Sequence, residues 1–244
     1  MNFKQFLLKE VSLRQILKPV PQNPEHHAEG DVYTHTRMVR SRLPLALDFI
    51  KKDKEKPDSV FKNLDMNLSG SDMRILKLAA WFHDIGKASA SKIGDDGKVK
   101  SYGHESPKHY MPMIDKLTGP IKEMYLSLSQ DDMNTLHFVI DNHMSLQREI
   151  GFPKKLYNIM YDDDGIIRNE RKPKLLVTFI LMDRTGRLNG ADFHSGISSF
   201  KDKQATSIMN AEKEIGDTIS HIRKSSTKHL DRIDRIKKNG GKSD

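Results

Sequence analysis

Histidine and aspartate side chains stand at the ends of three apolar stripes in this sequence. The first stripe leads to His83, with Asp84 beside it, the second leads to His143 and the third to Asp183. In each stripe, apolar residues precede the polar one by three, four and seven positions, which places all four on one face of an α-helix. A buried charge without a partner costs several kcal/mol, so groups on this inward face need each other or a cation. The pattern therefore predicts a metal site inside a helical bundle.

A weaker copy of the pattern occurs earlier, where Val32 and Val39 flank His35 at offsets of three and four. The chain contains no cysteine, so any metal must be held by nitrogen and oxygen. Such ligands suit Mn, Fe, Co, Ni, Zn or Mg rather than an iron–sulfur cluster. The sequence has no P-loop, no GxSxG nucleophile elbow, no HExxH and no GxGxxG after a strand, and thiol catalysis is excluded.

The length of 244 residues is enough for a sizeable core, and we expect one domain with appendages. Its expected parts are an N-terminal helix with a Pro-rich lead-in (1–23), a metal-binding domain (24–200) and a basic C-terminal helix and tail (201–244). No apolar run reaches the roughly 20 residues of a membrane span, and the N-terminus lacks the apolar core of a signal peptide. We therefore expect a cytoplasmic protein without membrane contact.

The chain is basic, with a formal net charge of +8, and residues 201–244 hold 11 Lys and Arg against 7 Asp and Glu. A basic balance favours anionic ligands such as nucleotides or RNA, bound chiefly by non-specific attraction. The tail would supply such contact with nucleic acid. Lys-rich helices in water explain the same composition equally well. The oligomeric state is not encoded in any pattern that we identify.

Strand signals are scarce, and the sequence predicts an all-α fold. Ser71 or Asp72 is expected to cap the helix that carries WFHD, and Gly86 to end it. A polar loop, 87–105, then separates two candidate ligands, and Ser106-Pro107 begins the next helix. The other expected helices are 3–18, 31–52 with a bend or an interruption at Pro44, 131–145, 173–187, and an exposed basic helix over 205–237.

Five segments, in the order HHAEGDVYTHT, WFHDIGK, GHES, DNHM and MDRTGR, resemble the motifs of the HD-domain superfamily of metal-dependent phosphohydrolases. The sequence is most similar to the HD domain attached to bacterial CCA-adding tRNA nucleotidyltransferases, over about residues 24–190. No Gly-rich strand–turn with a D-x-D pair precedes these segments, so the nucleotidyltransferase head is missing and CCA addition is not expected. The resemblance implies an HD-domain helical bundle around a metal site.

The resemblance also implies a set of ligands. It assigns His35, His83, Asp84 and Asp183 to a first ion, and binuclear relatives add two histidines in the interval that holds His104 and His143. The implied cofactor is one or two divalent transition metal ions (Mn, Ni, Co or Fe, with Mg also possible), and Asp84 would be the residue able to bridge two ions. Two alternatives stay open, because His104 could bind a substrate phosphate instead and His143 could orient another ligand.

Further residues of the expected pocket surround this set. Lys87 follows His83 by four residues, and the matching lysine of the family contacts a substrate phosphate, so Asp84 and Lys87 are the expected catalytic pair. Arg184 and Arg187 either line the mouth of the pocket or pair with surface acids.

The segment that precedes the first core helix is also expected to border the pocket. Within it, His27 is placed near the substrate by resemblance alone. By contrast, His109 and His137 are expected to be structural.

The implied activity is metal-assisted attack of water on a phosphoester, with 2′,3′-cyclic phosphates, 2′-nucleotides or RNA-end phosphates as substrates. A first alternative is a hydrolase of nucleoside mono- or triphosphates or of a signalling nucleotide. A second is a mixed-valent di-iron oxygenase, since some HD proteins use the same ligand order for oxidation. A third is a non-enzymatic RNA-binding module that keeps the fold.

Overall fold

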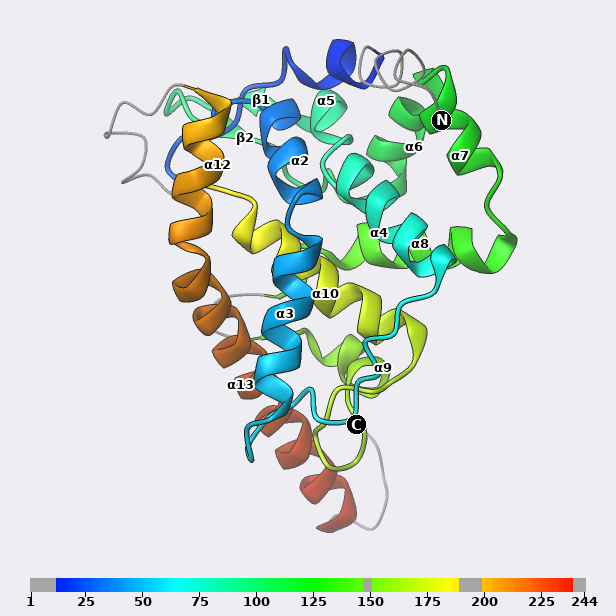
Figure 1. The fold of residues 1–244 in the computed structure, drawn as a ribbon, viewed down its shortest axis with the longest axis vertical. Coiled ribbons are helices and arrows are strands. Elements are labelled where there is room, and N and C mark those ends of the chain that lie inside the picture. Colours follow the sequence, from blue (N-terminus) through cyan, green and yellow to red (C-terminus); the bar gives the residue numbers. More distant parts are fainter. Residues whose placement is uncertain (1–11, 147–150, 189–198, 239–244) are drawn as a thin grey trace.

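Helices make up almost all of the regular structure in the described part of the chain (Figure 1). The computed structural model describes residues 12–146, 151–188 and 199–238. The predicted all-α fold is confirmed, with one small addition, an antiparallel hairpin of β1 (Lys92–Ile93) and β2 (Val99–Lys100). The helices are α2 (Val32–Arg40), α3 (Leu43–Lys54), α4 (Gly70–Phe82), α5 (Lys87–Ala90), α6 (Pro107–Lys116), α7 (Pro120–Leu126), α8 (Gln130–Asn142), the 3-10 turn η1 (Lys154–Leu156), α9 (Tyr157–Met160), α10 (Arg171–Thr185), α12 (Phe200–Met209) and α13 (Ala211–Lys238).

Three helices at the centre, α4, α8 and α10, run in the same direction. Their first turns meet at one end, where Arg171 of α10 contacts Asp72 of α4 and Asp132 of α8. Their last turns meet at the other end, where Nε2 of His83, directly after α4, lies 3.6 Å from Oδ1 of Asp183 in α10. A helix of 13 residues, the length of α4 and α8, spans about 20 Å. The predicted ligands therefore gather at one end of a parallel three-helix layer.

Helix α10 is the centre of the core, because residues 175–183 are all buried. A helix that is apolar on every side must be covered on every side. Helices α4 and α8 contact it, as do α2, α3 and α13 (Figure 1). Helices that precede α10 in the chain and one that follows it are thus needed to enclose the helix that carries Asp183.

The start of α4 corrects one prediction. Ser69, not Ser71 or Asp72, is the N-cap, because its hydroxyl accepts a hydrogen bond from the Asp72 N–H (3.0 Å). The Asp72 carboxylate in turn accepts from the Ser69 N–H (3.1 Å), which completes a capping box. The helix also ends earlier than expected, at Phe82, and Gly86 lies in the turn that follows.

Two predicted helical segments are each divided in two, the first by the interruption expected near Pro44 and the second unexpectedly. The segment 31–52 is α2 and α3, and Pro44, which cannot donate the hydrogen bond that a continuous helix needs, lies in the first turn of α3. The segment 205–237 is α12 and α13, with the break at Asn210. One face of α13 is buried, so the expected exposed helix is exposed only on its outer face.

The remaining predicted elements are found with small changes. Helices 131–145 and 173–187 correspond to α8 and α10, while the predicted loop 87–105 contains α5 and the hairpin. Of the predicted helix 3–18, residues 12–17 are helical and residues 1–11 lie outside the described chain. None of the described helices combines the length and the apolar character that crossing a membrane requires.

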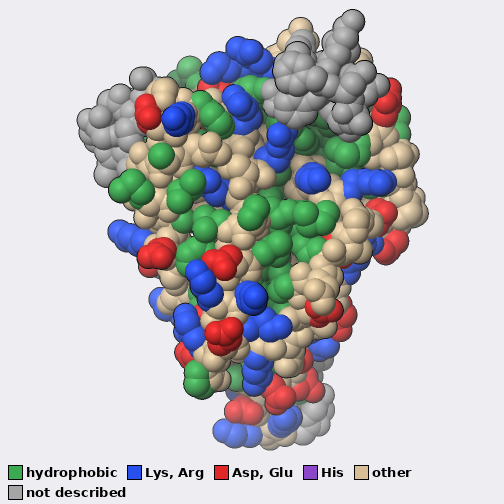
Figure 2. Space-filling view, viewed as in Figure 1, with side chains coloured by type: hydrophobic (Ala, Val, Ile, Leu, Met, Phe, Trp, Pro, Cys, Tyr) green, Lys and Arg blue, Asp and Glu red, His purple; other side chains and the backbone are tan. Residues whose placement is uncertain are grey.

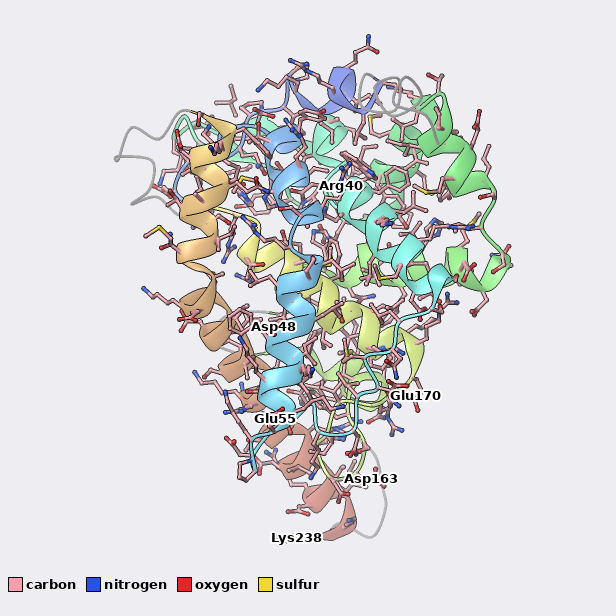
Figure 3. The ribbon with its side chains drawn as sticks, viewed as in Figure 1. Arg40, Asp48, Glu55, Asp163, Glu170 and Lys238 are labelled. Carbon is pink, nitrogen blue, oxygen red and sulfur yellow. The ribbon has the colours of Figure 1, made fainter. Side chains whose placement is uncertain are left out.

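Helix α2, which carries His35, is fixed to the central layer by an aromatic contact. The guanidinium carbon of Arg40, a residue labelled in Figure 3, lies 4.6 Å from the centroid of the Trp81 ring in α4. Such cation–π contacts contribute about 0.5–2 kcal/mol, depending on how far they are removed from water. This contact is two residues from His83 along the chain, so it holds the two helices together close to the predicted site.

Arg171 joins the first turns of the three central helices through a network of charged hydrogen bonds. Its Nε lies 2.7 Å from Oδ1 of Asp72, and its two terminal nitrogens lie 2.8 Å from Oδ2 of Asp131 and 2.6 Å from Oδ1 of Asp132. It also donates to the Ser71 hydroxyl (2.8 Å). Hydrogen bonds to charged groups are about twice as strong as neutral ones. This network fixes how far each helix extends toward the ligand end.

Removing this network should destabilise the fold. We expect Arg171→Ala to lower the free energy of unfolding by about 2 kcal/mol, since it leaves the partly buried Asp72 without its partner. The control is Lys52→Ala, which removes an ion pair to Asp48 whose two side chains are 67% and 51% exposed. Urea denaturation should show an effect below about 0.5 kcal/mol for the control. Equal losses of stability in the two variants would contradict the stabilising role of the Arg171 network.

The same network predicts a dependence of stability on pH. Hydrogen bonds from Ser71 and Arg171 lower the pKa of Asp132 to about 2, and hydrogen bonds from Arg171 and Ser69 lower that of Asp72 despite its burial. Both folded pKa values lie below the unfolded value of about 3.9, so the stabilisation is complete above that pH and is lost as the pH falls through the folded values. The stability difference between wild type and Arg171→Ala, measured by denaturation, should shrink between about pH 5 and pH 2. A difference that stays constant would refute this.

Candidate metal centre

The structure brings all six predicted ligands together at the ends of the central helices. His83 and His143 are the C-terminal caps of α4 and α8, and Asp183 lies in the last turn of α10. The middle of α2 supplies His35, and the segment before α6 supplies His104. The relative exposures of the six are 0% for His35, 1% for His83, 2% for Asp84, 5% for His104, 3% for His143 and 9% for Asp183.

A first group of donor atoms surrounds one oxygen of Asp84. Its Oδ2 lies 3.7 Å from Nε2 of His35 and 3.5 Å from Nε2 of His83. Oδ1 of Asp183 lies 3.0 Å and 3.6 Å from the same two nitrogens. Donors that each lie about 2.1 Å from one ion are roughly 3.0–3.5 Å from each other. The spacing of this group is therefore that of ligands around a single cation.

A second group surrounds the other oxygen of Asp84. Its Oδ1 lies 2.9 Å from Nε2 of His104 and 3.8 Å from Nε2 of His143. The side-chain ligand atoms of these three residues lie within 4.8 Å of one another. Asp84 thus turns one carboxylate oxygen to each group, which is the arrangement of a carboxylate that bridges two ions.

The histidines are oriented for metal binding by backbone carbonyls. The Nδ1 atoms of His83, His104 and His143 lie 3.3, 2.8 and 2.7 Å from the carbonyl oxygens of Ala80, Ser101 and Ile140 respectively. A carbonyl only accepts, so each Nδ1 carries the proton and each Nε2 presents a lone pair to the centre. Nε2 of His143 has no hydrogen-bond partner among the described residues, and Nε2 of His104 has none there besides the close approach of Oδ1 of Asp84 (2.9 Å).

Lone pairs on nitrogen that face carboxylate oxygens repel unless a cation lies between them. Burial lowers the pKa of His83 to about 4 and that of His143 to about 3, so at neutral pH these rings do not supply a proton. Burial by itself would raise the pKa of Asp84, but Lys87 and the surrounding histidines hold it well below its usual range. His83 and His143 are therefore neutral imidazoles beside the ionised carboxylate of Asp84, a combination of donors that fits a divalent cation.

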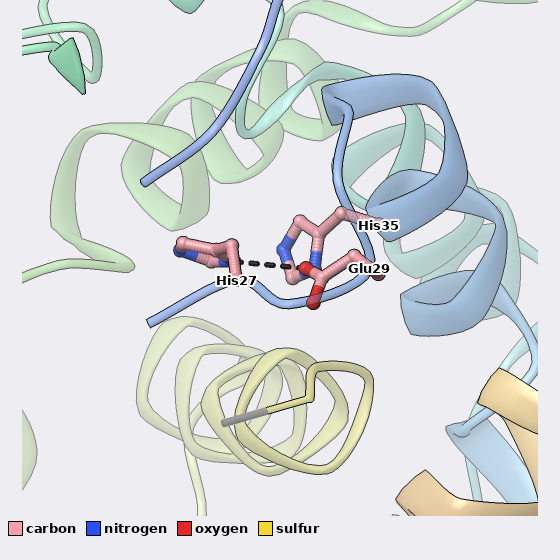
Figure 4. Close-up of side chains that lie close together, drawn as sticks. All are labelled: His27, Glu29 and His35. Atoms are coloured by element: carbon pink, nitrogen blue, oxygen red, sulfur yellow. Dashed lines mark hydrogen bonds and ion pairs between the residues drawn. The ribbon is translucent and has the colours of Figure 1, made fainter. Parts of the chain in front are cut away.

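Glu29 belongs to the segment that the resemblance places near the pocket, but sequence reasoning assigned it no role, and the structure shows one. Its Oε1 lies 2.8 Å from Nδ1 of His35 and 2.9 Å from Nδ1 of His27, and Figure 4 shows the carboxylate between the two rings. Its Oε2 accepts a hydrogen bond from the Leu188 N–H (3.0 Å), and the residue is 1% exposed. A carboxylate on the far nitrogen of a ligand histidine fixes its ring and strengthens it as a donor. The one sequence signal for this position was the glycine that follows it, which indicates a turn before the helix. In the structure Gly30 has a φ of +102° and turns the chain between Glu29 and α2.

His35 lies between two carboxylates as a result. Hydrogen bonds with Asp183 and Glu29 raise the pKa of His35 to about 10, even though burial works in the opposite direction. The same hydrogen bond from His35, together with the charges of the neighbouring rings, keeps the pKa of Asp183 well below its usual range in spite of burial.

Lys87 lies at the site, as predicted, and is held there from two sides. Its Nζ lies 2.8 Å from Oδ2 of Asp84 and donates to Oε1 of Gln22 (2.7 Å), and the residue is only 8% exposed. A buried ammonium group beside a bridging carboxylate is positioned to contact an anion bound between the two groups. Gln22 was not identified from the sequence, since no periodicity places it on an element.

The other candidate residues divide as follows. His27 borders the site through Glu29, with a side chain 19% exposed. Arg187 pairs with Glu214 of α13 at 3.1 Å, so of the two expected roles it has the one in which it pairs with an acidic residue. Arg184 donates a hydrogen bond to the backbone oxygen of Leu146. His109 contacts Ser89, and His137 lies against Tyr125, and within the described chain neither belongs to a group of side chains that could hold an ion.

No family model, curated protein or solved structure matches this chain. The donor atoms themselves therefore carry the assignment. The groups His35–His83–Asp84 and Asp84–His104–His143 could each hold an ion, and the set His27–Glu29–His35 is a third such group.

Metal content should report on the bridging position of Asp84. We expect about two Mn²⁺ per chain in the wild type, about one in His143→Ala and none in Asp84→Ala, because only Asp84 belongs to both groups. Elemental analysis after loading and desalting gives these numbers, with His137→Ala as a control that should keep wild-type content. Wild-type content in Asp84→Ala would contradict the bridged centre.

The turn after Asp84 should tolerate no side chain at Gly86. A Cβ there would overlap the carbonyl oxygen of His104, which the turn places against residue 86. We expect Gly86→Ala to lower the free energy of unfolding by about 1–3 kcal/mol. The control is Gly216→Ala in the middle of α13, where no atom lies within 4 Å of the added carbon. Denaturation should show a free energy of unfolding about 0.5–1 kcal/mol higher for the control than for wild type. A lower value for the control would mean that the loss in Gly86→Ala cannot be ascribed to the overlap with His104.

Proposed function

We propose that this chain is a metal-dependent phosphohydrolase of the HD type that acts on nucleotide or RNA-end phosphates. The observation that carries the proposal is that the two oxygens of Asp84 face two separate groups of ligands. A carboxylate placed between two metal groups is the core of sites that hydrolyse phosphoesters with paired ions. The order and spacing of the five sequence segments support the same assignment.

Two divalent ions at these groups would supply Lewis acidity, which polarises a phosphoryl oxygen and activates water. The chain itself contributes positioning and charge. Lys87, held by Asp84 and Gln22, places an ammonium group beside the metal ligands, where it offsets the negative charge that develops on a phosphoryl group. His27 donates from Nδ1 to Glu29, which directs Nε2 of its partly exposed ring away from that carboxylate and toward a substrate.

The proposed substrates are 2′,3′-cyclic phosphates, 2′-nucleotides and RNA-end phosphates. On a cyclic phosphate, the oxygen of water bonds to phosphorus, one of the two ester bonds breaks, and the ribose oxygen that leaves takes up a proton. The product is a monoester with one free ribose hydroxyl. A nearly closed centre, in which no ligand is more than 9% exposed, suits a terminal phosphate better than the middle of a duplex.

The test compares wild type with Asp84→Ala and Lys87→Ala on 2′,3′-cyclic nucleotides, 2′- and 3′-mononucleotides and an aryl phosphate, each with Mn²⁺, Ni²⁺, Co²⁺ and Mg²⁺. We expect turnover by wild type, none above background by Asp84→Ala, and about 10²–10³-fold lower kcat for Lys87→Ala. The matched control is Lys77→Ala, since Lys77 is an exposed lysine of α4 and its removal should leave kcat unchanged.

Two results would overturn the proposal. One is the absence of turnover on every substrate by folded protein that contains metal. The other is oxygen consumption by the iron-loaded protein without phosphoester cleavage, which would favour the di-iron oxygenase alternative.

A further inference from the structure

A second concave site lies beside α2, outside the metal centre. It is a pocket of about 330 Å³ between the N-terminal helical segment, α2 and α12, which lie next to each other in Figure 1. Three stretches of chain far apart in sequence are needed to form it. Its lining residues are Arg14, Lys18, Asp31, Tyr33, Thr34, Arg37, Phe200 and Lys203.

The pocket carries excess positive charge. Four of its residues are cationic and only Asp31 is acidic. The Asp31 carboxylate already accepts from the Thr34 N–H and hydroxyl (both 2.9 Å) and pairs with Lys18 (2.7 Å). Within the described ranges, neither Arg14 nor Arg37 pairs with a carboxylate. Figure 2 shows Lys and Arg side chains gathered over this upper part of the molecule.

Two of the cations are held in place before any ligand binds. The guanidinium carbon of Arg37 lies 4.0 Å from the centroid of the Phe200 ring and 5.8 Å from that of Tyr33. A guanidinium stacked on rings keeps its N–H edges free for phosphate oxygens. Lys203 is fixed by donation to the backbone oxygen of Glu29 (2.9 Å). Fixed cations beside aromatic rings are the usual components of single-strand nucleic-acid sites.

The position of the pocket indicates the length of its ligand. Successive residues of a helix are about 100° apart, so Tyr33, Thr34 and Arg37 lie on one side of α2 and His35 on the other. The helix is about 10 Å across, which is more than a single phosphate can bridge. The residue between the two sites is Glu29, which binds Lys203 through its backbone and His35 through its side chain.

We propose that this pocket binds the sugar–phosphate backbone of a single-stranded polynucleotide whose terminal phosphate reaches the metal centre. The binding is a property of the pocket alone, whereas the identification of its ligand with the substrate strand rests on the proposed phosphohydrolase function. The pocket selects strands over mononucleotides, because only a strand reaches both sides of α2.

The test measures binding of a labelled RNA of about 12 nucleotides by fluorescence anisotropy in EDTA, so that no turnover occurs. We expect Arg14→Glu/Arg37→Glu to bind at least tenfold more weakly than wild type and with a shallower salt dependence. The matched control is Lys224→Glu/Arg235→Glu on α13, which makes the same change in net charge away from the pocket. Wild-type affinity in the pocket variant, or an equal loss in the control, overturns the proposal.

A third variant and a kinetic comparison complete the test. Arg14→Glu alone changes an exposed side chain, so a weaker affinity in this folded single variant supports the pocket independently of any damage to α2. With Mn²⁺ present, kcat/KM of the double variant should fall at least tenfold more for RNA ending in a cyclic phosphate than for the mononucleotide. The two proposals can fail separately. If the wild type hydrolyses neither substrate but the pocket variants still lose RNA binding, the pocket is supported and only the hydrolase function is overturned.

Discussion

The structure depends on the burial of two ionised carboxylates, Asp84 and Asp183, at one end of its core. Moving an ionised carboxylate out of water costs several kcal/mol unless opposite charge and hydrogen bonds replace the water. Here Lys87 and four imidazoles surround the pair, and three helices of the central layer end at the same place. Helix C-termini carry partial negative charge, so the convergence of α4, α8 and α10 makes this end of the core still more favourable for cations. A cation is the simplest partner for the carboxylates and neutral imidazoles that meet there.

The opposite end of the central layer holds the helices in register. Arg171 gathers the first turns of α4, α8 and α10, about 20 Å from the ligands. Because each helix is rigid along its length, fixing the starts also fixes how the final turns meet. Ligands that stand on helix ends rather than on free loops are therefore positioned by contacts distant from the chemistry. His104, the candidate ligand from the irregular segment before α6, is held by its own chain through the Ser101 carbonyl and by the close approach of Gly86.

Helix α2 connects the candidate metal centre with the basic pocket. Its inner side carries His35, and its outer side carries Arg37 stacked on Phe200. Glu29, just before the helix, contacts both regions, since its carboxylate orients His35 and its backbone oxygen accepts from Lys203. The C-terminal helices thus have a role beyond supplying basic charge. Helix α12 builds one wall of the pocket, and α13 covers α10, so the part of the chain that composition alone treats as a basic tail belongs to the body of the fold.

The sequence by itself determined the all-α class and the polar ends of the three central helices, because spacing of three, four and seven residues is a local property that survives any arrangement of the helices. It placed His83, His143 and Asp183 on buried faces, and it excluded thiolate ligands. Exact helix limits depended on side-chain caps, and a neighbouring serine, Ser69, took the role predicted for Ser71 or Asp72. Only the tertiary structure decided that the two oxygens of Asp84 face different groups, that Glu29 and Gln22 support the site, and that Arg14, Arg37 and Lys203 share a pocket. Most of these contacts join residues that are tens to more than a hundred positions apart, and such pairings are set by how helices pack rather than by any period along the chain.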